Sequence, residues 1–257
     1  MEKSEIYSLL NQPIAELIAL ADKTRQEKAG SNIELCSIMN AKSGLCSQDC
    51  KFCSQSARHS TGISTYPLKT KAEILESARR AKDIGAERFD IVTSGNALAS
   101  DELAVIADSI FEITSKIGIK MCASLGSMDD KGFSLLKKAG LTRYHHNLET
   151  SQGFFSKIVT THTYQDRIKT INLAKKGGLE VCSGGIIGLG ETMDDRIEMA
   201  LTLKELDVDS VPINILVPIK GTGFENVDVL SSSEAIKTIA IFRIILEDKT
   251  IKIAAGR

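Results

Sequence analysis

Three cysteines stand close together in the segment CSQDCKFC, at Cys46, Cys50 and Cys53. Their C-x3-C-x2-C spacing places three thiols on one short loop, where they can converge on a soft metal centre. Structural zinc takes four ligands, usually as paired C-x2-C units, and no fourth Cys or His stands at such a spacing, although His59 follows shortly after. A [4Fe–4S] cluster held by three cysteines fits this set better, and its fourth iron would stay open for chemistry.

The compartment bears on the state of all six cysteines. The first residues, MEKSEIYSLLNQ, carry acids early and lack an apolar h-region, so they are not a secretory signal. We therefore expect a cytoplasmic protein whose thiols stay reduced. Cysteines in that setting are metal ligands or buried apolar residues rather than disulfides, and this applies equally to Cys36, Cys122 and Cys182.

Composition excludes several classes of partner. The 257 residues are 42% hydrophobic and 25% charged, which is typical of a globular domain. Lys and Arg number 32 against 33 Asp and Glu, so the chain lacks the basic excess of a nucleic-acid binder. No apolar run reaches the ~18 residues of a membrane span. We expect neither a nucleic-acid partner nor a membrane one.

Strand-like and helix-like segments alternate after the first ~30 residues, with a repeat the size of a βαβ unit. Helical patterns include 71–85, 101–118 and 193–207. Alternation of this kind predicts a parallel sheet with right-handed crossovers. The expected strands cover 33–39, 88–93, 119–125, 142–148, 179–187, 210–216 and 251–255.

Seven strands favour a parallel (β/α) barrel of the TIM type over an open doubly wound sheet. A complete eight-stranded barrel takes about 250 residues, and about 30 are used here by the leading helices, so we expect a barrel that is incomplete at its C-terminal end. We divide the chain into a helical extension, 1–30, in which Pro13 opens a helix and Gly30 ends one, and a barrel domain, 31–257. The cysteine loop then follows the first strand, on the functional face of such a fold.

An aromatic residue, Phe52, precedes the last cysteine of the loop. With the C-x3-C-x2-C spacing after a first strand, this resembles the radical S-adenosylmethionine superfamily. The resemblance implies that the open iron binds S-adenosylmethionine. An electron from the cluster then cleaves the sulfonium and yields a 5′-deoxyadenosyl radical, which abstracts hydrogen from an unactivated carbon. The protein's part is to orient the reactants and exclude water.

Longer stretches resemble the biotin synthase family, in order and over nearly all of residues 33–257. They are KSGLCSQDCKFCSQSARHSTG, YHHNLETS, TYQDRIKTINLAKKGGLEVCSGGIIGLGET, SVPINILVPIKGT and IKIAAGR. The resemblance implies a sulfurtransferase that converts dethiobiotin to biotin, with sulfur taken from an auxiliary iron–sulfur cluster. It also implies a homodimer and an electron donor such as flavodoxin or ferredoxin.

Site residues follow from the resemblance where positions match. Cys46, Cys50 and Cys53 match the ligands of the radical cluster. His145 stands at a substrate position where the family carries Asn, and Asn214 matches a residue that contacts dethiobiotin. The positions that match cofactor contacts are Phe52, Asn147, Glu149, Arg167, Ile186 and Val217.

The auxiliary cluster is where the chain departs from the family pattern, which uses three cysteines and one arginine. Cys122, Cys182 and Arg257 match three of these ligands, whereas Asp90 stands at the remaining cysteine position. A carboxylate is a poorer iron–sulfur ligand than a thiolate. We hypothesise that Cys36, in the first strand, replaces the missing thiol; the alternative is that these three are buried apolar cysteines.

Two other functions stay open on the sequence. One is a related radical barrel enzyme, of the hydrogenase-maturation or methylornithine-forming type, which shares the three-cysteine motif. The other is a non-catalytic iron–sulfur protein. The glycine-rich SGGIIGLGE segment is not a G-x-G-x-x-G nucleotide loop, and we interpret it as the end of the fifth strand, where backbone can approach a ligand closely.

Overall fold

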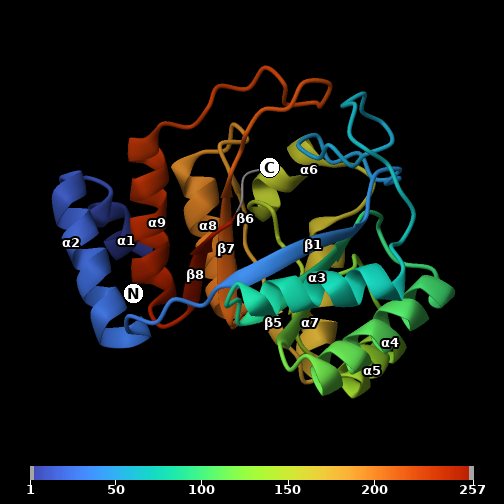
Figure 1. The fold of residues 1–257 in the computed structure, drawn as a ribbon. Helices are drawn as coiled ribbons and strands as arrows, with labels where there is room; N and C mark the ends of the chain where they lie inside the picture. The colour runs from blue at the N-terminus through green and yellow to red at the C-terminus, as the bar shows by residue number, and fades with distance from the viewer. Residues whose placement is uncertain (1–2, 255–257) are drawn as a thin grey trace.

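Parallel strands form one curled sheet in the computed structural model, which describes residues 3–254 (Figure 1). Alternation of strand and helix along the chain produces this arrangement, because each helix returns the chain for another parallel strand. The predicted incomplete barrel is therefore confirmed. The strands are β1 Cys36–Lys42, β2 Arg88–Thr93, β3 Lys120–Ser124, β4 Leu141–His145, β5 Glu180–Cys182, β6 Gly185–Ile187, β7 Ser210–Ile215 and β8 Thr250–Ile253.

The sheet order is β1-β2-β3-β4-β5-β7-β6, with β8 also paired to β7. The single fifth strand predicted over 179–187 is divided into β5 and β6. At the division Ser183 N–H donates to the Ser210 carbonyl at 2.9 Å, and Gly184 N–H donates to Asn147 Oδ1 at 3.1 Å. A Cβ on Gly184 would lie 2.0 Å from the Pro212 carbonyl oxygen, so the close approach at this segment is to the protein's own backbone.

Helices cover the outer face of the sheet, and their first turns are fixed by side-chain caps. Thr70, Thr163 and Thr192 each form a reciprocal capping box with the acidic residue three positions on, which satisfies free N–H groups at the helix start. The helices after β1 are α3 Lys71–Asp83, α4 Ser100–Lys116, α5 Asp130–Ala139, α6 Gln152–Ile158, α7 Tyr164–Lys176, α8 Met193–Glu205 and α9 Ser232–Leu246.

The N-terminal extension is helical as predicted, with α1 Lys3–Leu9, α2 Ile14–Thr24 and a short π-helix, η1 Arg25–Ala29. Pro13 caps the start of α2 and Gly30 ends η1 with φ of 75°. The extension lies against α9 (Figure 1). Ile6 and Leu17 are fully buried in the same core as the barrel helices, and the division at residue 30 stays a prediction.

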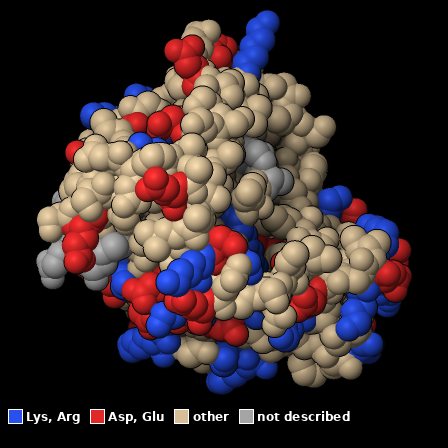
Figure 2. Space-filling view, turned by 90° about the vertical axis from the view of Figure 1, so that its left-hand side faces the viewer, with Lys and Arg blue, Asp and Glu red and all other residues tan. Residues whose placement is uncertain are grey.

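The curled sheet has β1 at one edge and β8 near the other, and within residues 3–254 no ladder joins them. Lys, Arg, Asp and Glu are mixed over the face seen in Figure 2 rather than separated by sign. Among the described helices, none combines the length and the apolar character that crossing a bilayer requires.

Candidate radical-cluster and cofactor site

A cavity of about 460 Å³ opens at the carboxyl ends of the first four strands. That volume lies in the range of small-molecule sites. The structure gathers around it eight of the residues that the sequence singled out: Cys46, Cys50, Phe52, Cys53, His145, Asn147, Glu149 and Arg167. They come from the loop after β1, the end and following loop of β4, and helix α7.

The cysteine loop is held by its own backbone and by a carboxylate. Cys46 N–H donates to the Gln55 carbonyl at 3.0 Å, and Cys53 N–H donates to the Cys50 carbonyl at 2.9 Å. Between the first two cysteines, Asp49 accepts from the backbone N–H and the hydroxyl of both Thr160 and Thr161. The loop is therefore fixed to the segment that leads into α7.

The three thiols differ in burial. Cys50 is buried, whereas Cys46 and Cys53 are half-buried, and none of the three forms a disulfide. Burial raises the pKa of Cys50 to about 12, although the nearby Arg167 guanidinium acts in the opposite direction. Such a thiol becomes a thiolate only with strong positive charge beside it, which iron supplies.

The donor set fits an iron–sulfur cluster better than a single zinc ion. Within residues 3–254 no three Cys, His, Asp or Glu side chains converge tightly enough to bind one metal ion. A four-iron cluster needs a wider set, because each thiolate binds a separate iron. The three thiols of the loop line one cavity, where each would bind one iron.

Asn147, Glu149 and Arg167 lie in contact with one another. Asn147 Nδ2 donates to Glu149 Oε2 at 3.3 Å, and Arg167 Nη1 lies 3.6 Å from Glu149 Oε1. Glu149 adopts φ of 74°, a left-handed conformation that costs about 1 kcal/mol for a residue with a side chain. Its N–H donates to the Gly184 carbonyl at 3.1 Å and its carbonyl accepts from Ile186 N–H at 2.8 Å, which holds this strained position. Strain of this kind is concentrated at functional sites.

The sequence reasoning missed Gln48, His146 and His162, which also line the cavity. His162 Nδ1 lies 2.8 Å from Gln48 Oε1, and Arg167 donates to His162 Nε2 from Nε at 3.2 Å. Burial lowers the pKa of His162 to about 4, with Arg167 acting in the same direction, so this imidazole is neutral. His162 lies between the cysteine loop and the YQDR segment, and this position is the signal that could have identified it as a site residue.

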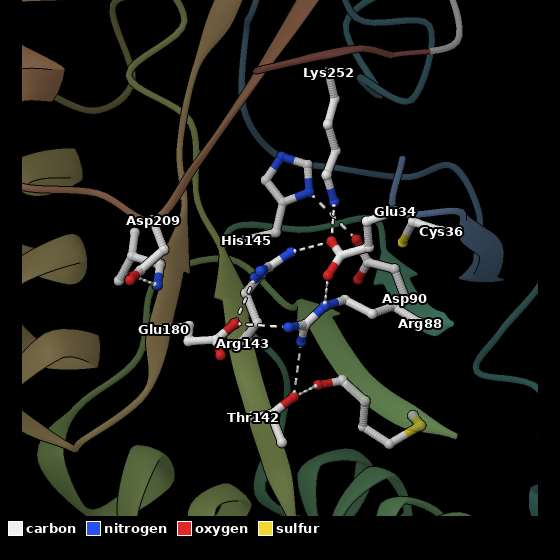
Figure 3. A network of polar contacts seen from close by, with 12 residues as sticks. Glu34, Cys36, Arg88, Asp90, Thr142, Arg143, His145, Glu180, Asp209 and Lys252 are labelled. Atoms are coloured by element: carbon white, nitrogen blue, oxygen red, sulfur yellow. Dashed lines mark hydrogen bonds and ion pairs between the residues drawn. The ribbon is translucent and has the colours of Figure 1, made fainter. Parts of the chain in front are cut away.

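A second group of thiols lies deeper in the barrel. Cys122 donates a hydrogen bond to Cys36; this lowers the pKa of Cys36 and, with burial, raises that of Cys122. Burial raises the pKa of Cys182 to about 11. The Lys252 ammonium acts on the pKa of both Cys36 and Cys182 in the opposite sense to burial, so both thiols lie within reach of its charge. Figure 3 shows Lys252 and Cys36.

Asp90, at the position where the family pattern has a cysteine, is buried beside these thiols. Its Oδ2 lies 3.3 Å from His145 Nδ1 (Figure 3), and its Oδ1 has no hydrogen-bond partner among residues 3–254. One oxygen of the Asp90 carboxylate thus contacts the His145 imidazole on β4.

An ion-pair network closes the opposite end of the barrel interior (Figure 3). Glu34 accepts from Arg88 Nε at 2.6 Å, Arg143 Nη1 at 2.7 Å and Lys252 Nζ at 2.7 Å. Burial alone would raise the pKa of Glu34, but the three donors outweigh it and lower the pKa to about 2. Glu180 also accepts from Arg88 and Arg143.

Three of the predicted cofactor-binding and substrate-binding residues stand outside the cavity lining. Ile186 is fully buried in β6, and Val217 is 54% exposed beyond β7. Asn214 is buried and donates from Nδ2 to the Gly185 carbonyl at 3.3 Å. Arg257 lies outside the described residues. The roles given to these four stay predictions.

The fold and the three-cysteine loop define the chain's class. Residues 42–203 match the family model described as the Radical SAM superfamily, so the chain is a member of that superfamily. Residues 212–257 match the Biotin and Thiamin Synthesis associated domain. The chain is 58% identical to the biotin synthase of Thermotoga neapolitana, over 88% of this chain and 82% of that one. Identity to the biotin synthase of Thermotoga petrophila is 52%, over 98% and 84%. The chain belongs to the biotin synthase family.

Solved structures agree on the fold. Methylornithine synthase superposes with a TM-score of 0.86 at 21% identity, over 97% of this chain and 74% of that one. The [FeFe]-hydrogenase maturase of Carboxydothermus hydrogenoformans gives a TM-score of 0.83 at 21% identity, over 97% and 61%. At such low identity these similarities establish a shared architecture and no more.

Proposed function

We propose that the chain forms biotin from dethiobiotin, using S-adenosylmethionine and two iron–sulfur clusters. The observation that carries this is the meeting of three thiols with Asn147, Glu149 and Arg167 around one cavity. Membership of the biotin synthase family selects the reaction. The methylornithine synthase and the hydrogenase maturase match the fold at only 21% identity, well below the biotin synthases.

The residues around the cavity take distinct parts in this proposal. Cys46, Cys50 and Cys53 would hold a [4Fe–4S] cluster, which supplies the electron that cleaves S-adenosylmethionine. Glu149 and Arg167 carry opposite charges 3.6 Å apart and offer contacts to the ribose and to the charged end of the cofactor. The remaining lining excludes water from the radical.

We further propose that Cys36, Cys122 and Cys182 hold the auxiliary cluster that donates sulfur. Cys122 acts on the pKa of Cys36, and Lys252 acts on that of both Cys36 and Cys182; this proximity supports Cys36 as the replacement thiol. Asp90 directs Oδ2 to His145 instead. With two C–H bonds to break, the reaction consumes two 5′-deoxyadenosyl radicals and inserts one sulfur atom.

The setting of the reaction belongs to the same proposal. None of the six cysteines, all within residues 3–254, forms a disulfide, which suits the reducing cytoplasm. We place the protein there as a homodimer that receives electrons from a flavodoxin or a ferredoxin.

Anaerobic reconstitution tests the proposed function. Iron and acid-labile sulfide per chain, 5′-deoxyadenosine and biotin are measured after incubation with S-adenosylmethionine, dethiobiotin and reductant. We expect two clusters, 5′-deoxyadenosine and biotin. 5′-Deoxyadenosine without biotin would indicate another radical enzyme, and its absence from a fully reconstituted sample would indicate a non-catalytic iron–sulfur protein. Zinc in the cysteine loop would contradict both.

The auxiliary site is tested separately by Cys36→Ala. We expect loss of the second cluster's iron and retention of the radical cluster, whereas Cys46→Ala gives the opposite pattern. Unchanged iron in Cys36→Ala would show that Cys36 is a buried apolar residue.

A further inference from the structure

A continuous line of polar contacts crosses the cavity wall from β2 toward the cysteine loop. It begins at Asp90, whose Oδ2 lies 3.3 Å from His145 Nδ1, the pair drawn in Figure 3. His145 Nε2 then lies 3.0 Å from Asn147 Oδ1, and Asn147 Nδ2 donates to Glu149 at 3.3 Å. Four side chains from two separate segments, β2 and the end of β4 with the loop after it, are thus connected.

The line continues on the other side of Glu149. Arg167 Nη1 lies 3.6 Å from Glu149 Oε1, and Arg167 Nη2 lies 3.0 Å from His162 Nε2. His162 Nδ1 in turn lies 2.8 Å from Gln48 Oε1, between the first two cysteines of the loop. We call these seven residues the polar line: Asp90, His145, Asn147, Glu149, Arg167, His162 and Gln48.

Backbone contacts fix the direction of the hydrogen bonds at the Asp90 end. Asn147 Oδ1 accepts from Gly184 N–H at 3.1 Å, so it is an acceptor and His145 Nε2 must donate to it. One hydrogen therefore lies between His145 Nδ1 and the Asp90 carboxyl. With both ring nitrogens engaged, the imidazole of His145 has one orientation.

The same reasoning applies at the other end. Arg167 has only donors, so His162 Nε2 accepts and His162 Nδ1 donates to Gln48 Oε1. The ring of His162 also packs edge-on against Phe155, with centroids 5.7 Å apart. His145 thus joins the buried Asp90 to Asn147, and His162 joins the half-buried Gln48 to Arg167.

We propose that Asp90 with His145 at one end, and His162 at the other, are positioning residues that hold Asn147, Glu149 and Arg167 in the arrangement that binds S-adenosylmethionine. The inference rests on the proposed function, because it takes the middle three as the cofactor's contacts. Side chains locked by neighbours bind with less loss of conformational entropy than free ones. One end of the polar line is anchored on β2 in the barrel wall. The other end is anchored in the loop that carries the thiols.

The test measures the affinity for S-adenosylmethionine in protein reconstituted with the radical cluster, by equilibrium dialysis and by the change in the reduced cluster's EPR spectrum. We expect Asp90→Ala, His145→Leu and His162→Leu each to weaken binding about tenfold, the effect of one lost hydrogen bond. The double variant of Asp90→Ala and His145→Leu should bind no more weakly than the worse single one, because the two act through one contact.

Asp90→Asn is the conservative variant. Its amide can donate to His145 Nδ1 while His145 Nε2 still donates to Asn147, so affinity should stay within about threefold of the parent protein. Asp209→Ala, which removes a carboxylate that accepts from Val181 N–H outside the polar line, is the matched control and should leave affinity unchanged.

Affinities within about twofold of the parent in all three weakened variants would overturn the inference. If Asp90→Ala does not fold, His162→Leu decides alone, since it alters the opposite end of the line. If the parent protein with its cluster does not bind S-adenosylmethionine, the proposed function fails and the inference fails with it. Binding by the parent and equal binding by the variants would refute the inference alone.

Discussion

Asp49 does not line the cavity, yet it helps to fix the cysteine loop. Its carboxylate accepts four hydrogen bonds from Thr160 and Thr161, and these outweigh burial to hold the pKa of Asp49 well below its usual range. The loop between Cys46 and Cys50 has this carboxylate as its connection to the segment before α7. The geometry of the thiols therefore depends on a contact more than a hundred positions away in sequence.

We expect Asp49→Ala to lower the free energy of unfolding by about 2 kcal/mol, because several donors lose their acceptor. It should also lower the iron retained per chain after exposure to a chelator. Urea unfolding of the cluster-free protein and iron analysis measure the two effects. Asp130→Ala is the control, because its ion pair with Lys176 is exposed and should contribute less than about 1 kcal/mol. Equal stability in both variants would contradict the role given to Asp49.

For single residues, the sequence predicts that the thiols of one loop lie together, but it does not predict contacts between strands. Cys46, Cys50 and Cys53 are close because the chain between them is short. The contact of Asp90 with His145 joins residues 55 positions apart and depends on the registers of β2, β3 and β4. No local pattern carries that information.

Among the elements, the divided fifth strand has the most direct effect on the site. Glu149 bridges to Gly185, and its carbonyl accepts from Ile186 N–H, so the loop after β4 rests on the start of β6. A Cβ on Gly185 would lie 2.4 Å from the Glu149 carbonyl oxygen and 2.5 Å from Met199 Sδ. The flexible Met199 side chain could move away from such a Cβ, but the Glu149 backbone could not do so as easily.

We expect Gly185→Ala to displace Glu149 and to weaken binding of S-adenosylmethionine at least tenfold, with about 2 kcal/mol lost from the free energy of unfolding through overpacking. Gly153→Ala is the matched control. Gly153 lies in α6 with open space around its Cα, so alanine should be neutral or stabilise the helix by up to about 1 kcal/mol. Dialysis and thermal unfolding measure both. If Gly185→Ala bound S-adenosylmethionine as tightly as the parent protein, the close packing of Gly185 against the Glu149 backbone would be unimportant for the site.

Element positions were largely predictable, and the errors have physical causes. The first strand was expected over 33–39 but is Cys36–Lys42, because Ile33 is 80% exposed and precedes the ladder with β2. The helices expected over 71–85, 101–118 and 193–207 are Lys71–Asp83, Ser100–Lys116 and Met193–Glu205, so each end falls within two residues of its expected position. The break in the fifth strand was not, since it arises from contacts with Pro212 and Asn147 rather than from local propensity.

For the whole molecule, the question is what joins the two edges of an incompletely closed sheet. Glu34 precedes β1 and Lys252 lies on β8, and their side chains meet at 2.7 Å although no ladder pairs these strands within residues 3–254. Arg88 and Arg143 hold the same carboxylate from β2 and β4. The network thus connects the sheet's edges through its interior, where a complete barrel would use backbone hydrogen bonds.

We expect Glu34→Gln to lower the free energy of unfolding by about 2 kcal/mol at neutral pH, because it leaves three cations with a weaker acceptor. The folded pKa of Glu34 is about 2, below its unfolded value, so its contribution is complete above about pH 4.5 and is lost as pH falls toward 2. As pH falls over that interval, the variant's free energy of unfolding in urea should therefore decrease less steeply than that of the parent protein. The backbone amides of β8 should exchange hydrogen with solvent faster in the variant. Glu180→Gln is the control, because Glu180 accepts from Arg88 and Arg143 but does not reach Lys252. If β8 exchanged equally fast in both variants, closure by Glu34 would be refuted.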